Sequence, residues 1–254
     1  MSTGLSLADL RAHLVPARDL EARERRTRLP TGSPLLDQAL GGGWPRGAVS
    51  EVRGARGQGR TTVLLASLAA ALQAGHAAAL VDFGGMFDPR AAARAGILLD
   101  RLLWVRAPAP GPGGPPAAPS RVVTPARRSP ERLLLSAAET IVSAGGFGLL
   151  VLDFGERVPS IPSATWIRLR QLVTAPGTVV LVIAAHPVSS LFGATSLCLE
   201  HAHPRFSAEA VAGPVRGPAL LSSIEVVVNL KRAAGNGNGA GPQTVSLPLV
   251  HSPT

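Results

Sequence analysis

Short apolar runs alternate with longer amphipathic segments through the middle of the chain. The runs are apolar nearly throughout, which is typical of parallel strands buried on both faces. The segments between them carry apolar residues at helical spacing. This alternation predicts an α/β fold with a mainly parallel, twisted sheet flanked by helices. The predicted strands are 48–53, 77–82, 102–106, 149–153 and 178–185. The predicted helices are 62–74, 89–95, 131–144 and 164–174.

The pattern changes near the C-terminus. Strand-like runs at 224–230 and 244–250 flank a segment of glycine, asparagine and alanine at 235–241. Such a pair predicts an antiparallel hairpin, which we place at the far edge of the sheet. Residues 107–130 are rich in proline and glycine and predict a loop insertion. The core domain is predicted to span 29–254.

Residues 1–28 predict a helical and basic appendage. Leu7, Leu10 and Leu14 form an apolar stripe, but a helix this short is marginal in water unless it docks on something. It is therefore expected to dock, on the core of its own chain or on another chain, or to stay disordered. The arginine-rich stretch at 23–28 fits either a solvated helix or a contact surface for DNA or protein, and both alternatives stay open.

Composition narrows the class of protein. The chain has 254 residues, 46% of them hydrophobic, which is enough for a full core. The formal net charge of +9 favours polyanionic partners, so direct DNA binding is a candidate. A single cysteine, Cys198, excludes an internal disulfide and suits a reducing compartment. No signal segment or membrane-length apolar run is evident, so a cytoplasmic protein without membrane contact is predicted, with association with the nucleoid as a further option.

A glycine-rich loop lies between the first predicted strand and the first predicted helix. It meets the phosphate-loop pattern G-x-x-x-x-G-K-[ST] at every fixed position except the lysine, where arginine stands. The glycines let backbone N–H groups face an anion, and the helix N-terminus adds partial positive charge. Arginine can pair with phosphate, but it is larger and planar and does not fill the space of a lysine. The predicted nucleotide-binding residues are Gly54, Gly57, Gly59, Arg60, Thr61 and Thr62.

A second motif, an apolar strand that ends in Asp153, follows further along the chain. In phosphate-loop proteins a carboxylate at this place holds magnesium, so Thr61 and Asp153 are the predicted Mg²⁺ ligands. Hydrolysis also needs a group that orients or deprotonates water. Asp82 ends its strand before apolar residues and glycine, and Asp88 is better suited to cap the helix that begins at Pro89. The predicted cofactor is therefore ATP or ADP with Mg²⁺, with no catalytic residue for its hydrolysis.

The histidines and the cysteine carry weaker signals. His186 follows the last parallel strand, where it could face the phosphate side of the sheet or simply turn into a loop. His201 and His203 are expected to be surface or partner-contact residues, because matched metal ligands are missing nearby. Cys198 is expected to be a small buried apolar residue.

Several segments together resemble the RecA/RadA recombinase superfamily. The lead-in to the phosphate loop is similar, and so is the spacing of the segments after the following helix. The resemblance covers about residues 29 to 186 and implies a RecA-like phosphate-loop domain. It rests on 29–37, 39–47, 80–82, 87–92, 95–97 and 100–103.

The departures from that superfamily pattern concern its chemistry. Arg60 stands at the lysine position and Gly84 at the position of the catalytic glutamate. Residues 184–186 replace a polar pair that couples nucleotide state to DNA binding, and the segments where the two DNA-binding loops would lie are short. These losses point to a relative that no longer hydrolyses ATP.

Within the superfamily, residues 41–48 look most like ImuA-type accessory proteins of translesion synthesis. That resemblance implies a role in DNA repair and the SOS response, with a Y-family-like, ImuB-type polymerase or a RecA-like filament as partner. The alternative is a DNA-dependent ATPase or recombinase in which Arg60 replaces the lysine.

Overall fold

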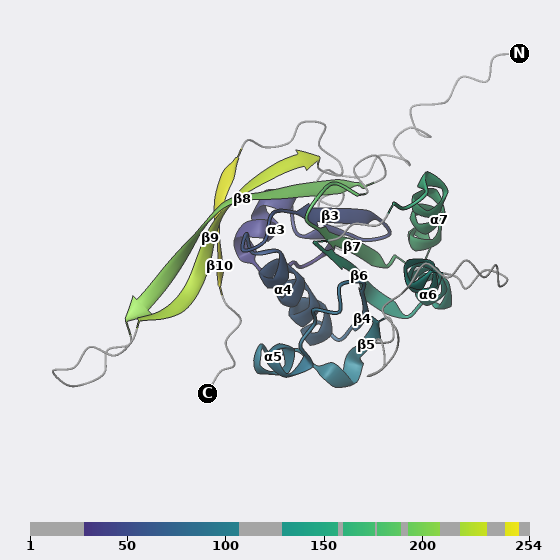
Figure 1. Cartoon of the computed structure of the whole chain (residues 1–254), viewed down its shortest axis with the longest axis horizontal. Helices are drawn as coiled ribbons and strands as arrows, with labels where there is room; N and C mark the ends of the chain where they lie inside the picture. The colour runs from purple at the N-terminus through teal and green to yellow at the C-terminus, as the bar shows by residue number, and fades with distance from the viewer. Residues whose placement is uncertain are drawn as a thin grey trace, which may run out of the picture.

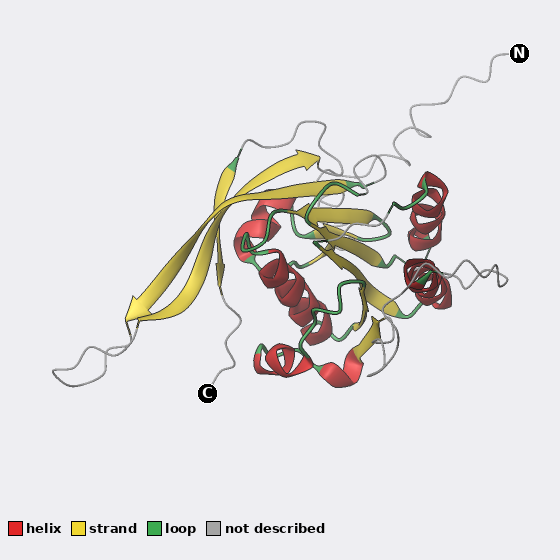
Figure 2. Cartoon of the chain, in the orientation of Figure 1, coloured by secondary structure: helices red, strands yellow, loops and turns green. Residues whose placement is uncertain are grey.

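The apolar runs form the centre of one mixed sheet (Figures 1 and 2). The computed structural model describes residues 28–106, 129–156, 160–175, 177–188, 193–208, 219–232 and 242–248. Within them the sheet has eight strands in the order β10-β9-β8-β3-β7-β6-β4-β5. These strands are β3 (Val49–Arg53), β4 (Ala77–Asp82), β5 (Leu102–Arg106), β6 (Phe147–Gly155), β7 (Val179–Ala184), β8 (Thr195–Ala208), β9 (Ala219–Arg232) and β10 (Gln243–Pro248).

Helices cover both faces of this sheet, as the sequence predicted. Neighbouring strands pair in parallel along the part of the sheet with the order β8-β3-β7-β6-β4-β5. Strands β9 and β10 add antiparallel pairing at the β8 edge. The helices are α3 (Pro34–Leu40), α4 (Arg60–Gln73), α5 (Pro89–Arg94), α6 (Pro130–Ala144) and α7 (Ser163–Thr174), with a short 3₁₀ turn at Leu99–Arg101. Side chains of α3, α4 and α5 pack on one face, and those of α6 and α7 pack on the other. The predicted α/β fold, including the C-terminal antiparallel pair, is confirmed.

The sheet separates two apolar cores, and the central strands contribute to both. Leu149 and Val151 of β6 point to the α4 core, whereas Leu150 and Leu152 point to the α6–α7 core. Each of these side chains is fully buried, which stabilises the fold by roughly 1.5–3 kcal/mol per large aliphatic residue. Burial on both faces explains why the strand has no polar alternation.

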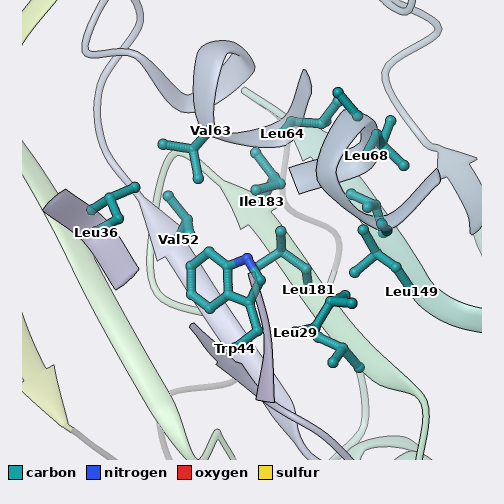
Figure 3. Packing of buried hydrophobic residues seen from close by; sticks show 14 of the residues in the cluster. Leu29, Leu36, Trp44, Val52, Val63, Leu64, Leu68, Leu149, Leu181 and Ile183 are labelled. Atoms are coloured by element: carbon teal, nitrogen blue, oxygen red, sulfur yellow. The ribbon is translucent and has the colours of Figure 1, made fainter. Parts of the chain in front are cut away.

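The segment that leads into β3 is fixed by a buried tryptophan. Trp44 lies in β2 (Trp44–Pro45), which pairs with β1 (Arg28–Leu29) to form a separate two-stranded sheet. Its indole Nε1 donates a hydrogen bond to Ser67 Oγ on α4 at 3.0 Å, and Ser67 Oγ donates to the Thr31 carbonyl at 3.3 Å. Figure 3 shows the indole among apolar side chains of α3, α4 and the sheet. The lead-in therefore closes over the α4 core.

Strand β8 was not predicted from the sequence. It runs beside β3 and continues with β9 as a long ribbon (Figure 1), whereas β10 pairs only with residues 223–228 of β9. The alternation of β8 is interrupted by a bulge between Glu200 and His203, at which His201 has a φ of 47°. An interrupted period of two weakens the strand signal.

The interpretation of Cys198 as a buried apolar residue was wrong. Cys198 lies on β8 opposite Arg53 and is only partly buried. Burial raises the pKa of the thiol, and its hydrogen bond with Glu200 acts in the same direction. Cys198 thus lies beside the polar side chains of Arg53 and Glu200 and in neither apolar core.

Some predictions fall on residues that the structure does not describe. The appendage, apart from Arg28, and the loop insertion up to residue 128 lie outside the described residues, as does the hairpin tip at 235–241. Among the described helices, none combines the length and apolar character needed to cross a bilayer.

Candidate nucleotide site

The loops that follow β3, β4 and β6 meet at the carboxyl ends of the parallel strands, where ligands bind in open α/β sheets. They enclose a pocket of about 640 Å³. Its lining comprises Arg56, Gly57, Gly59, Arg60, Thr61, Thr62, Phe83, Gly84, Met86, Asp153, Phe154, Gly155, Glu156, Ile183 and Ile224.

The phosphate loop has the backbone expected of an anion nest. Gly57 and Gly59 have φ values of 84° and 88°, and Gly59 directly precedes α4. Most of the predicted nucleotide-binding residues line the pocket. Gly54 is the exception, because it is buried at the back of the loop, where a Cβ would lie 3.0 Å from the Leu199 carbonyl oxygen. Gly59 also lies against the C-terminal strands, with a Cβ position 3.1 Å from Leu247 Cδ1.

The arginine at the lysine position is engaged by the protein itself. Arg60 is only 8% exposed. Its Nη1 donates to the Gly155 carbonyl at 2.8 Å, and its Nη2 forms an ion pair with Glu156 Oε1. The Gly155 carbonyl also accepts from the Ala185 N–H at 3.1 Å, so the residue that follows β7 helps to hold this partner in place. The side chain lines the pocket, yet its charge is directed at protein groups.

Asp153 lines the pocket and is partly buried. One carboxylate oxygen accepts the Gly155 N–H at 3.0 Å. Burial raises the pKa of Asp153, and the negative charges of Asp82 and Glu156 add to the rise, whereas the Gly155 N–H and Arg60 lower it. The ionised carboxylate is therefore held in an unfavourable environment, as is common where a ligand will bind.

Replacing Asp153 by asparagine should raise the melting temperature near neutral pH. A raised pKa in the folded state means that ionisation of Asp153 opposes folding: its stabilising contribution is complete below the unfolded pKa and is lost as pH rises through the folded pKa. Asparagine keeps an oxygen for the Gly155 N–H but carries no charge.

Thermal unfolding of the wild type and Asp153→Asn at pH 7.5 and pH 4.5 measures this effect. The gain should shrink at the lower pH, and the exposed Asp100→Asn should show no comparable gain. A lower melting temperature for Asp153→Asn at pH 7.5 would contradict the assignment.

The predicted magnesium ligands share this pocket. Thr61 is exposed at the start of α4, and the Asp153 carboxylate lies on the same lining. A hydroxyl and a carboxylate fit Mg²⁺, which takes few protein ligands and completes its octahedron with water and phosphate oxygens. Among the described residues there is no group of three or more His, Cys, Asp or Glu side chains that could hold a metal without a ligand's help. With nucleotide bound, Thr61 and Asp153 would hold the ion, which would neutralise phosphate charge.

The end of β4 and the loop that follows it offer no side chain suited to act as the general base that activates water. Asp82 is 1% exposed, and its carboxylate accepts the N–H groups of Gly85, Met86 and Phe87 at 2.7, 3.2 and 3.1 Å. It shapes the 83–87 loop and does not line the pocket. Gly84, at the position where the resemblance to the RecA/RadA superfamily places a glutamate, does line the pocket and offers no side chain. Asp88 caps α5 by accepting the Arg90 N–H, which confirms the predicted cap.

The histidines lie elsewhere. His186 is exposed after β7 and does not line the pocket. His201 and His203 are exposed on β8. Sequence reasoning missed other pocket residues, of which Arg56 and Glu156 matter most for charge. Arg56 was visible within the loop itself, whereas Glu156 is brought to Arg60 only by the fold.

Comparison with known proteins agrees with this geometry. Residues 18–113 match the family model of the RecA N-terminal domain. RecA of Treponema denticola is 34% identical over 126 residues, which is 49% of this chain. The α/β architecture is consistent with a RecA-like fold, and the matches support the RecA/RadA superfamily.

Other RecA proteins give matches of the same kind. RecA of Kineococcus radiotolerans is 49% identical over 76 residues, and RecA of Enterococcus faecalis is 33% identical over 134 residues. These matches cover 30% and 52% of this chain. The chain spans only 25%, 22% and 32% of the lengths of the T. denticola, K. radiotolerans and E. faecalis proteins. The similarity thus covers part of this chain and a smaller part of each of these three relatives.

Proposed function

We propose that this protein is a RecA-like accessory factor in DNA damage tolerance that binds nucleotide without turning it over. The observation that supports this most is the engagement of Arg60. Its guanidinium pairs with Glu156 and the Gly155 carbonyl, and both partners belong to the protein. A group so engaged is a poor substitute for the lysine that follows the β- and γ-phosphates.

Binding and hydrolysis need different groups. Binding uses the backbone N–H groups of the loop, whose donors do not depend on the lysine. Hydrolysis needs charge stabilisation in the transition state and a group that activates water. Gly84 supplies no such group, and the carboxylate of Glu156 is paired with Arg60. The pocket is therefore suited to hold a nucleotide and poorly suited to cleave it.

The finer role follows the resemblance of residues 41–48 to ImuA-type proteins. On that basis the partner would be a Y-family-like, ImuB-type polymerase or a RecA-like filament, in translesion synthesis. The exposed Phe206 on the β8–β9 ribbon and the net charge of +9 give such partners, or DNA, a surface to contact. Co-purification with a Y-family-like polymerase would test this part.

ATP turnover should stay at background with or without single-stranded DNA. Steady-state phosphate release measures it, with a bacterial RecA protein as the active control. Asp153→Asn defines the background rate of phosphate release, since it removes the carboxylate predicted to hold magnesium.

DNA-stimulated turnover that is lost in Arg60→Ala would overturn the accessory role. It would favour the alternative, a DNA-dependent ATPase or recombinase. The co-location of Thr61 and Asp153 in the pocket is the feature that suits that alternative.

A further inference from the structure

Glu156 pairs with Arg60 in the way that a nucleotide phosphate pairs with the lysine of an ordinary phosphate loop. The lysine of this loop pairs with the β- and γ-phosphates. Arg60 occupies the lysine position, and its Nη2 pairs with the Glu156 carboxylate instead. We propose that Glu156 is an internal substitute for the terminal phosphate, so that the pocket takes nucleoside diphosphates in preference to triphosphates. This inference rests on the proposed function, since it requires that nucleotide binds.

The pair is positioned by the sheet. Glu156 directly follows β6, which ends on Gly155 with a φ of 59°. The register of β6 with β7 shifts between Asp153 and Gly155, just before Glu156. Arg60 is anchored on the Gly155 carbonyl while it reaches Glu156. The contact thus joins two fixed backbone segments.

Charge explains the preference for a diphosphate. Glu156 lines the pocket beside Arg60, and Arg60 is the cation paired with it. A γ-phosphate would add negative charge beside the Glu156 carboxylate and find Arg60 already paired. The α- and β-phosphates depend on the loop N–H groups, and the exposed Arg56 lies on the same lining. Binding of a diphosphate therefore leaves the internal pair intact.

The pair can also be opened. The Glu156 side chain is 53% exposed, in contrast to 9% for that of Arg60. Glutamate can therefore move into solvent, whereas Arg60 stays at the pocket. Neutralising Glu156 should release the Arg60 guanidinium for a third phosphate group. The affinity for the triphosphate should then rise by an amount typical of close charge pairs.

Titrations of the full chain with fluorescent ADP and a fluorescent non-hydrolysable ATP analogue test this inference. The wild type should bind ADP more tightly. Glu156→Gln should shift the affinity ratio toward the triphosphate by about tenfold. Glu139→Gln is the matched control, because Glu139 pairs with Arg168 at 3.1 Å between α6 and α7, away from the pocket. It should leave the ratio unchanged.

Glu156→Ala serves as a second variant, and thermal unfolding verifies that both variants fold. An unchanged ratio in the folded Glu156 variants, or a wild type that prefers the triphosphate, would overturn the inference while leaving nucleotide binding in place. If the wild type and both variants bind neither nucleotide, the inference and the proposed nucleotide binding fail together.

Discussion

Replacing Gly32 by alanine should destabilise the protein by about 3–5 kcal/mol, the cost of forcing a side chain into close-packed backbone. Gly32 has a φ of 83°, and a Cβ there would lie 2.4 Å from the carbonyl oxygen of Ala66. Neither atom can move freely, because Ala66 is in the middle of α4 and Gly32 lies between Thr31 and Ser33, which share a buried hydrogen bond. Relief of the contact would have to displace the lead-in or bend α4.

Gly75 provides a matched control for the backbone strain. Its φ is 85°, but nothing lies within 4 Å of its Cβ position. Gly75→Ala should therefore cost only about 1 kcal/mol, the penalty of a left-handed conformation. Chemical denaturation of both variants separates the two contributions. Equal losses of stability would mean that the segment around Gly32 moves away from α4 at little cost, so that this contact contributes little to stability.

Replacing Asp82 by alanine should cost about 2–3 kcal/mol, since it leaves three backbone N–H groups without their charged acceptor. Asp82 is almost fully buried, whereas Gly85 and Met86 are exposed, so water can replace only part of what the carboxylate accepts. The loop it holds carries Gly84 and Met86 into the pocket lining. The variant should therefore lose order in the loop as well as global stability.

Asp88→Ala is the control for Asp82, because its carboxylate also accepts a backbone N–H, that of Arg90 at 2.8 Å, but at an exposed helix cap. It should cost about 1 kcal/mol. Denaturant unfolding gives both values, and hydrogen exchange at residues 83–87 reports on the loop. If Asp82→Ala is no more harmful than Asp88→Ala, the carboxylate does not organise this loop.

The central sheet was predictable because its strands are buried on both faces. Leu149 to Leu152 lie in an unbroken apolar run, and each side chain has a core to enter. Strand β8 was missed for the opposite reason. Leu197 and Leu199 point to the α4 core, but the alternating residues Cys198 and Glu200 are only partly buried, and the bulge after Glu200 interrupts the alternation. A half-covered, bulged strand leaves little trace in a hydropathy pattern.

In the candidate site, the loop glycines and Asp153 could be recognised because motif spacing fixes them. Glu156 could not, since its meaning depends on Arg60, which is 96 positions away in the chain. One signal was available. An arginine buried at a loop that normally holds lysine needs a counter-charge when no ligand is bound, and Glu156 follows the motif strand directly.

Because the phosphate loop packs against β8, β9 and β10, its glycines have a structural role besides anion binding. Gly54 lies against Leu199, and Gly59 lies against Val226 and Leu247, so alanine at either position would press on the C-terminal strands. The absence of a side chain at these two positions lets the C-terminal strands lie close to the loop, whether or not an anion enters it. Residues that contact only a nucleotide could change without disturbing these strands, whereas the two glycines could not. A phosphate-loop motif in a sequence can therefore indicate a ligand site, and it can also indicate close packing of the loop against neighbouring strands.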